Sequence, residues 1–267
     1  TTSTVIDDIA DEGDEVAKIK FGALPYGFVR LNDAIEIRII DNDFATSTWG
    51  TPLNPTYGVV LSTAPVGYYD ALEGKSGATL KQALQDIIAN PEVVHAQNYG
   101  DTETILKMAD QNPLNNNEVW MMYVEKSRPK FEFQDTGINT GKWNREHIYP
   151  QSRGGFTDGT SGLSDGINIW LPTNADDILA GHGDAHHIRA EDGPENSIRN
   201  NKDYGEYIGP NKSQGSWHGD VARSLFYMAV RYNSLRLVNG NPDNTTVGQL
   251  GDLALLLQWN KSDKADD

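Results

Sequence analysis

The sequence contains no cysteine, which excludes disulfide bonds and thiolate metal sites but does not fix a redox compartment. It has no run of 18 apolar residues, so it predicts no membrane-spanning helix. No secretory signal peptide is recognisable, which predicts a mature or trimmed form. Basic residues are few: 22 Lys and Arg stand against 38 Asp and Glu, a net charge of −16. This balance argues against a high-affinity nucleic-acid binder. It allows an enzyme with a local basic patch, because screening limits exposed charges to about 8 Å at physiological salt.

The 267 residues include 37% hydrophobic residues, enough for a globular domain with a full core. Residues 1–45 differ from the rest of the chain in their pattern of apolar and polar residues. The stretches "VAKIKFG" and "AIEIRIIDND" alternate apolar and polar residues, and turn residues lie between them, so we expect a β-hairpin. The acidic runs "DDIADEGDE" and "DND" at the strand ends suit structural Ca²⁺, with a solvated acidic loop as the alternative. This segment resembles the C-terminal half of a Calx-β domain.

Residues 46–65 are rich in Thr, Pro and Gly and predict a linker or an extended segment. Residues 66–267 contain longer elements. "SGATLKQALQDIIAN" has helical spacing behind a candidate cap at Ser76, and "NNEVWMMYVEKS" is typical of a buried strand. "GDVARSLFYMAVRYNSL" predicts an amphipathic helix, and "TVGQLGDLALLLQWN" a shorter one.

Three stretches between these helices carry most of the reactive side chains: "WNREHIYP" (143–150), "GHGDAHHIRA" (181–190) and "GPENSIRNNKDYGEY" (193–207). We expect a strand bearing Glu146 and His147, then a second strand bearing His186 and His187. A helix that begins near Pro194 would follow. Proline suits the first turn of a helix, and Asp192 before it is a candidate N-cap. This helix would present Asn196 and Arg199, with a cation between the three elements.

These motifs resemble the endonuclease I family of secreted and periplasmic nucleases. "YYDALEGKSGATLKQALQDII" resembles the opening of the family, "NREHIYPQS" its first active-site strand, "DAHHIRAEDGPENSIRNN" its second strand and helix, and "GDVARSLFYMAVRY" the next helix. Ala190 replaces the family's usual proline, and His218 replaces a basic residue. The resemblance implies an α+β fold: a mixed helical nuclease domain with a ββα-metal (His-Me finger) active site, preceded by the short hairpin.

The resemblance also implies that His147 is the general base, while Glu146 and Asn196 hold a single divalent cation. Imidazole has a pKa near 6.5, so it can accept a proton from water at neutral pH. A carboxylate and an amide oxygen suit Mg²⁺, with Mn²⁺ or Ca²⁺ as alternatives in the same site. Candidates for phosphate contacts are Arg145, Arg189, Arg199 and Lys202, of which Arg189 and Arg199 also count as catalytic candidates. Residues expected to orient the site from behind are Asp184, His186, His187 and Asn201, the last with a helix cap as its alternative.

We therefore expect a secreted or periplasmic, Mg²⁺-dependent endonuclease without sequence preference. By resemblance it would leave 5′-phosphate and 3′-hydroxyl ends on DNA, with RNA as a further substrate. No membrane contact and no obligate protein partner are expected. One alternative is a zinc hydrolase that uses His182, Asp184, His186 and His187, because zinc favours imidazole ligands. The other is a non-catalytic, calcium-stabilised adhesion or matrix protein, suggested by the acidic hairpin.

Overall fold

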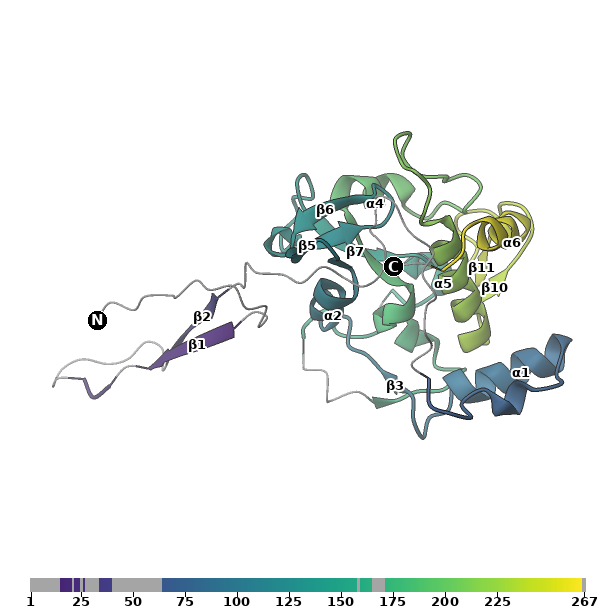
Figure 1. Ribbon diagram of the computed structural model, residues 1–267, viewed down its shortest axis with the longest axis horizontal. Coiled ribbons are helices and arrows are strands. Elements are labelled where there is room, and N and C mark those ends of the chain that lie inside the picture. The colour runs from purple at the N-terminus through teal and green to yellow at the C-terminus, as the bar shows by residue number, and fades with distance from the viewer. Residues whose placement is uncertain are drawn as a thin grey trace.

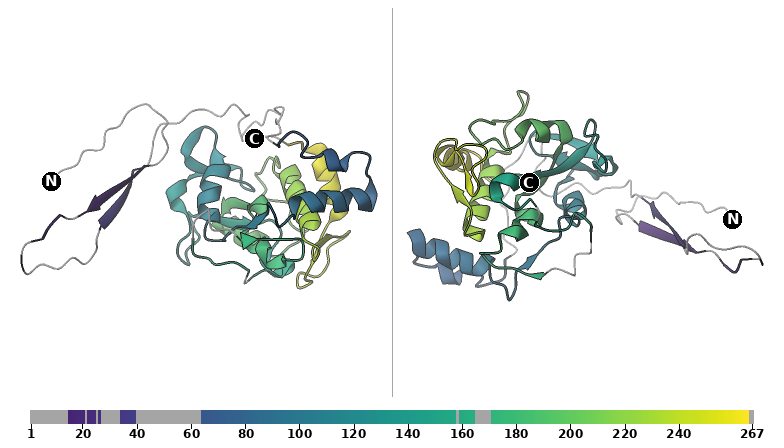
Figure 2. Two further views of the ribbon diagram at one scale, coloured as in Figure 1. Left: turned by 90° about the horizontal axis from the view of Figure 1, so that it is seen from below. Right: turned by 180° about the vertical axis from the view of Figure 1, so that it is seen from behind.

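The computed structural model describes residues 15–20, 22–24, 26, 34–39, 64–157, 159–164 and 171–265. Strands β1 (Glu15–Lys20) and β2 (Ala34–Ile39) pair antiparallel, which confirms the predicted hairpin. Figures 1 and 2 show this hairpin apart from the body of the protein. Apart from Glu15, the candidate calcium runs lie outside the described residues, as does almost all of the expected linker over residues 46–65. The domain boundaries stay a prediction.

The body mixes helices with small sheets, which confirms the α+β prediction. Its α-helices are α1 (Gly77–Ile88), α2 (Thr102–Ala109), α3 (Gln151–Gly154), α4 (Gly193–Arg199), α5 (His218–Arg231) and α6 (Leu253–Ser262). Its strands are β3 (His95–Ala96), β4 (Gln111–Asn112), β5 (Asn115–Met121), β6 (Lys126–Pro129), β7 (Trp143–His147), β8 (Leu171–Pro172), β9 (Ile188–Asp192), β10 (Arg236–Leu237) and β11 (Gln249–Leu250). Short 3-10 helices are η1 (Asp70–Leu72), η2 (Lys130–Glu132), η3 (Ile178–Gly183) and η4 (Ala185–His187). Within the described part of the chain, no helix is long and apolar enough to cross a membrane.

The predicted helices form where their apolar spacing places them. Helix α1 begins after Ser76, which has the extended backbone of an N-cap but makes no capping hydrogen bond through its side chain. Gln85 of α1 donates a hydrogen bond to the backbone oxygen of Val230 at 2.7 Å, so the helix packs beside α5 (Figure 2). Helix α6 packs along α5 as well. Asp252 accepts from the backbone nitrogen of Ala254 and caps α6, as an N-cap carboxylate does.

Strand β7 lies at the junction of two hydrophobic clusters. Trp143 at its start is fully buried with Leu106, Val119 and Ile188. Ile148, directly after the strand, is fully buried in the larger cluster under α5 and α6. Burial of one such side chain stabilises the fold by roughly 1.5–3 kcal/mol, so both ends of β7 are anchored. The polar residues between them are held in place by this packing.

Candidate active site

Strands β7 and β9 form an antiparallel ribbon, and α4 follows β9 without a loop. The register pairs Glu146 with Arg189 and His147 with Ile188. Asp192 accepts a hydrogen bond from the backbone nitrogen of Glu195 at 3.2 Å, so it caps α4 as the sequence predicted. Helix α4 packs on both strands. The expected order of strand, strand and helix is therefore present.

The second strand begins later than the sequence predicted. His186 and His187 belong to η4, and β9 starts at Ile188. The physical reason is Asp184, whose carboxylate accepts from the backbone nitrogen of His186 at 3.1 Å and caps a 3-10 turn there. A residue in this turn cannot also join the ladder with β7.

Glu146 is almost fully buried, and its carboxylate is held on one side. Its Oε1 accepts a hydrogen bond from the Tyr123 hydroxyl at 2.8 Å and lies 3.4 Å from Nη1 of Arg199. Burial raises the pKa of Glu146 to about 7, although Arg199 and Tyr123 both act to lower it. No hydrogen bond from another described residue uses Oε2. This second oxygen is therefore available to a ligand.

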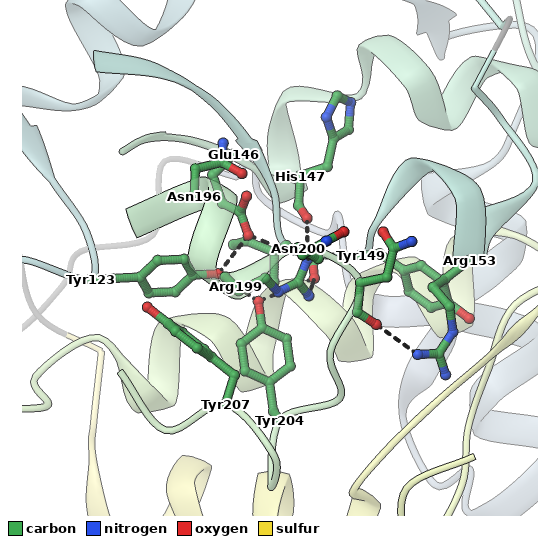
Figure 3. Close-up of polar contacts among 12 residues, drawn as sticks. Tyr123, Glu146, His147, Tyr149, Arg153, Asn196, Arg199, Asn200, Tyr204 and Tyr207 are labelled. Atoms are coloured by element: carbon green, nitrogen blue, oxygen red, sulfur yellow. Dashed lines mark hydrogen bonds and ion pairs between the residues drawn. The ribbon is translucent and has the colours of Figure 1, made fainter. Parts of the chain in front are cut away.

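Asn196, on α4, holds its amide nitrogen toward β7. Nδ2 donates to Oδ1 of Asn144 at 2.8 Å and to the backbone oxygen of Arg145 at 3.3 Å. The carboxamide is planar, so its oxygen faces away from these acceptors. Figure 3 shows this carboxamide beside the Glu146 carboxylate. An amide oxygen and a carboxylate oxygen from two fixed elements are the ligands that Mg²⁺ takes when water and phosphate complete its shell, so the residues present fit such a cation.

His147 is the last residue of β7, and its ring is fixed by a backbone group. Nε2 lies 2.8 Å from the carbonyl oxygen of His182. A carbonyl only accepts, so Nε2 carries the proton and Nδ1 has the lone pair. Nδ1 lies 3.2 Å from the side-chain nitrogen of Gln151, which donates to it. Burial holds the pKa of His147 well below its usual value, and His187 lowers it further. The imidazole is therefore neutral at neutral pH.

His147 extends from β7 in another direction than Glu146 (Figure 3), as expected for neighbours on a strand. Both side chains can serve one site because β7 ends at His147. A substrate that crossed the end of the strand would meet both residues.

Arg199 lies on α4 with Asn196, as the sequence predicts, but its guanidinium is enclosed. Its side chain is 1% exposed. Nη1 donates to the backbone oxygens of His147 at 3.1 Å and Asn200 at 3.0 Å, and Nη2 donates to that of Ile148 at 2.6 Å. This position does not suit the expected phosphate contact, because the guanidinium is enclosed and engaged with the chain after β7. Arg199 instead braces the end of β7 and the Glu146 carboxylate.

The other three candidate phosphate ligands are basic side chains with different surroundings. Arg145 is half-buried, and its guanidinium carbon lies 3.7 Å from the centre of the Tyr99 ring. Nη1 of Arg189 donates to the backbone oxygens of Ala185 and Ile188. Nζ of Lys202 donates to the backbone oxygen of Ile198 at 2.7 Å. The side chains of Arg189 and Lys202 are thus engaged by nearby backbone oxygens, whereas the guanidinium of Arg145 stacks on the Tyr99 ring beside the site.

Asp184, His186 and His187 organise the segment behind His147. Asp184 accepts hydrogen bonds from the hydroxyls of Tyr227 and Tyr232, and its hydrogen bond with His186 helps to hold its pKa low against the raising effect of burial. Nε2 of His187 donates to the backbone oxygen of Gly181 at 2.8 Å. These contacts fix η3, whose His182 carbonyl holds His147. Among the described residues, no group of three or more His, Asp or Glu side chains could hold a metal ion, so the zinc alternative finds no site there.

Asn201 contributes through its backbone. Its carbonyl oxygen accepts from Nη1 of Arg153 at 2.8 Å. The C-cap of α4 is Asn200, which has a φ of 51°. The capping role that was the alternative for Asn201 therefore belongs to its neighbour, because asparagine tolerates this left-handed backbone better than most residues.

Several residues around the site were missed in the sequence. Tyr123 holds Glu146, and its hydroxyl also lies 2.7 Å from that of Tyr204. The one available signal was that Tyr123 lies within the predicted buried strand "NNEVWMMYVEKS", because a buried hydroxyl needs a polar partner. Gln151 lies within the motif itself. Tyr99 and the His182 carbonyl have no signal in the sequence, since both act through contacts between distant segments.

Known proteins place the chain in a family. The family model described as Endonuclease I matches residues 76–267. An "Extracellular ribonuclease" of Bacillus subtilis (strain 168) is 36% identical over 221 residues, 75% of this chain and 67% of the relative. An "Extracellular ribonuclease" of Bacillus amyloliquefaciens is 36% identical over 242 residues, 81% of this chain and 74% of the relative. No solved structure matches significantly. The match begins at residue 76 and gives no support to the Calx-β resemblance. The matched residues include the motifs on β7, β9 and α4. The chain belongs to the endonuclease I family of nucleases.

Proposed function

We propose that this chain is a secreted endonuclease that hydrolyses phosphodiester bonds of RNA and DNA without sequence preference, using His147 as general base and one divalent cation. The observation that carries the proposal is the grouping of the Glu146 and Asn196 oxygens at the end of β7, where His147 is neutral. The names of the extracellular relatives support secretion and RNA as a substrate. Mg²⁺ is the cation we propose, since two protein oxygens leave most of its shell to water and phosphate.

His147 would act through Nδ1. The lone pair on this nitrogen takes a proton from a water molecule as the water oxygen attacks phosphorus. The P–O3′ bond breaks, the leaving 3′ oxygen takes a proton from a water molecule, and His147 returns its proton to solvent. The products are a 5′-phosphate and a 3′-hydroxyl. The hydrogen bond from Nε2–H to the His182 carbonyl keeps the ring in this tautomer and becomes stronger when the ring is protonated.

The remaining residues would bind and orient. Tyr123 and Arg199 fix Oε1 of Glu146, so that Oε2 faces the same space as the Asn196 oxygen. A bound divalent cation would supply electrophilic stabilisation of the phosphoryl group and of the leaving oxygen. Arg145 is proposed to contact a non-bridging phosphate oxygen. Contacts to phosphate carry no sequence information, which accounts for the proposed lack of base preference.

Water as the nucleophile makes the 2′-hydroxyl unnecessary, so the chemistry treats RNA and DNA alike. A test uses RNA and DNA oligonucleotides of one sequence with Mg²⁺ or with EDTA, and analyses the new ends. We expect both to be cut with Mg²⁺ and neither with EDTA, with 5′-phosphate ends. The His147→Ala variant should be inactive on both. A 2′,3′-cyclic phosphate on RNA together with intact DNA would refute the proposal, because that product requires the 2′-hydroxyl as nucleophile.

A further inference from the structure

Tyr99 lies between a cation and an imidazole at the proposed site. The guanidinium carbon of Arg145 is 3.7 Å from the centre of its ring, and the ring of His182 is 4.3 Å away at an interplanar angle of 27°. Two groups this close to one ring would overlap on a single face. They therefore occupy opposite faces, and the tyrosine ring separates them.

The backbone of Tyr99 reinforces both contacts. Its carbonyl oxygen accepts from Nη1 of Arg145, and its nitrogen donates to Oγ1 of Thr160 at 3.0 Å. Nδ1 of His182 lies in turn 3.0 Å from the backbone nitrogen and 2.9 Å from the backbone oxygen of Thr160. Tyr99 thus belongs to a closed set of contacts that fixes Arg145 on one side and His182 on the other.

Gly100 explains why this segment can take its position. A Cβ atom there would lie 2.2 Å from backbone atoms of Leu163 and Ser164, so only glycine allows the two segments to approach. The nitrogen of Gly100 donates to the backbone oxygen of Ser161 at 3.0 Å. The chain at Tyr99 is therefore clamped to the loop that carries Thr160.

His147 is attached to the same arrangement. Its Nε2 donates to the His182 carbonyl, its ring lies parallel to that of His182 at 5.7 Å, and the Tyr99 ring is 5.1 Å away. A shift of the tyrosine ring would move both the proposed phosphate ligand Arg145 and the carbonyl that orients His147.

We propose that Tyr99 is a positioning residue of this nuclease, which acts through its ring to hold Arg145 and His182, and through His182 the orientation of His147. This inference rests on the proposed function. Tyr99 lies outside the motifs around β7, β9 and α4, in the segment between β3 and α2. A cation over a tyrosine ring contributes energy that an aliphatic side chain cannot replace.

The test compares Tyr99→Phe, which keeps the ring, with Tyr99→Leu, which removes it. With Mg²⁺ and a DNA oligonucleotide we expect kcat/KM of Tyr99→Phe within about threefold of wild type, and a loss of about tenfold or more for Tyr99→Leu, much of it in kcat. Tyr99→Met, which fills more of the volume, replaces Tyr99→Leu if circular dichroism shows that the latter does not fold. Equal losses in the Phe and Leu variants would overturn the proposal, because they would assign the effect to the hydroxyl.

The matched control is Trp259→Leu, on α6. Trp259 stacks on His218 with a ring distance of 4.0 Å and an interplanar angle of 11°, so this variant also removes a ring that stacks on an imidazole. We expect this variant to lose thermal stability but keep kcat. If Tyr99→Leu and the control variant lost kcat by the same factor, the loss would be a general effect of removing a ring. This result would overturn the positioning role of Tyr99.

A double-mutant comparison separates action through Arg145 from an independent effect. In an Arg145→Ala background, Tyr99→Leu should reduce kcat/KM by a clearly smaller factor than in wild type, because one of its two targets is already gone. An unchanged factor would contradict the proposal.

A binding measurement in EDTA keeps the inference distinct from turnover. The dissociation constant of a single-stranded DNA oligonucleotide is measured against salt concentration. Loss of one phosphate contact lowers the logarithmic slope by about 0.7. We expect this decrease for Arg145→Ala and Tyr99→Leu but not for Tyr99→Phe. Absence of cleavage by wild type would refute the proposed function, whereas a wild-type slope for Tyr99→Leu would refute the role of Tyr99.

Discussion

Nε2 of His147 donates a hydrogen bond to the backbone oxygen of His182 at 2.8 Å. This contact leaves Nδ1 as the basic atom of the ring without involving any carboxylate. Many catalytic histidines are oriented by an acidic side chain, which also stabilises the protonated ring. Here a neutral carbonyl orients the ring, and burial keeps its pKa low, so a proton that His147 accepted as the proposed base would be readily passed on.

The Gln151 amide is predicted to compete with water for this basic atom. Its nitrogen lies 3.2 Å from Nδ1 of His147, where an attacking water would have to donate its own hydrogen bond. We expect Gln151→Ala to keep kcat or raise it by up to about threefold, since a neutral hydrogen bond of this kind contributes on the order of 1 kcal/mol. Steady-state kinetics on a DNA oligonucleotide provide the measurement, with His147→Ala as the inactive reference. A tenfold loss in Gln151→Ala would instead show that the amide places the water.

The ionised carboxylate of Glu146 is expected to lower the stability of the fold when no cation is bound. Its pKa is raised from 4.5 to about 7 by burial, so the folded protein loses stability as the pH rises from 4.5 through 7. Between pH 4 and pH 8 in EDTA we expect wild type to lose on the order of 2–3 kcal/mol more unfolding free energy than Glu146→Gln, because the carboxamide does not titrate. Urea unfolding at both pH values measures this difference, which is independent of any constant cost of an amide beside Arg199.

The same variant tests the cation site without any activity assay. Added Mg²⁺ or Mn²⁺ should raise the melting temperature of wild type and leave that of Glu146→Gln nearly unchanged, because a cation stabilises only the fold that binds it. Asn196→Ala should show a reduced response. An equal shift in all three proteins would place the cation elsewhere.

The sequence predicts the elements of this site better than their contacts. The periodicity of the strands and the Asp192 cap depend on neighbouring residues, and both are present as expected. Arg199 shows the limit of the same reasoning. Helical spacing correctly puts it one turn from Asn196, but only the packing of the chain after β7 shows that its guanidinium is enclosed. Tyr99 could not be predicted at all, since its partners lie about 45 and 80 residues away along the chain.

His187 is expected to make the fold sensitive to acid. Burial lowers its pKa to about 4, and its Nδ1 accepts a hydrogen bond from the backbone nitrogen of Tyr149 that protonation would break. A depressed histidine pKa means that stability is fully present above 6.5 and is lost as the pH falls from 6.5 through 4. Between pH 7.5 and pH 4.5 we expect wild type to lose on the order of 3 kcal/mol more unfolding free energy than His187→Gln. Urea unfolding at both pH values measures this difference, and His95→Gln, at an exposed position on β3, controls for the loss of one histidine. Parallel losses in wild type and His187→Gln would show that other groups cause the acid sensitivity.

Arg199 is predicted to be essential for the fold around Glu146 rather than for phosphate binding. A lysine at this position cannot replace the planar guanidinium that donates to the backbone oxygens of His147, Ile148 and Asn200. Breaking a buried ion pair of this kind costs about 3–5 kcal/mol, and we expect Arg199→Lys to lose an unfolding free energy near the lower end of this range. The remaining folded protein should bind Mg²⁺ more weakly, because Oε1 of Glu146 loses a partner. Lys202→Gln, just past the end of α4, is the matched control and should keep wild-type stability. If Arg199→Lys were as stable as wild type and differed only in KM and its salt dependence, Arg199 would be a phosphate ligand after all.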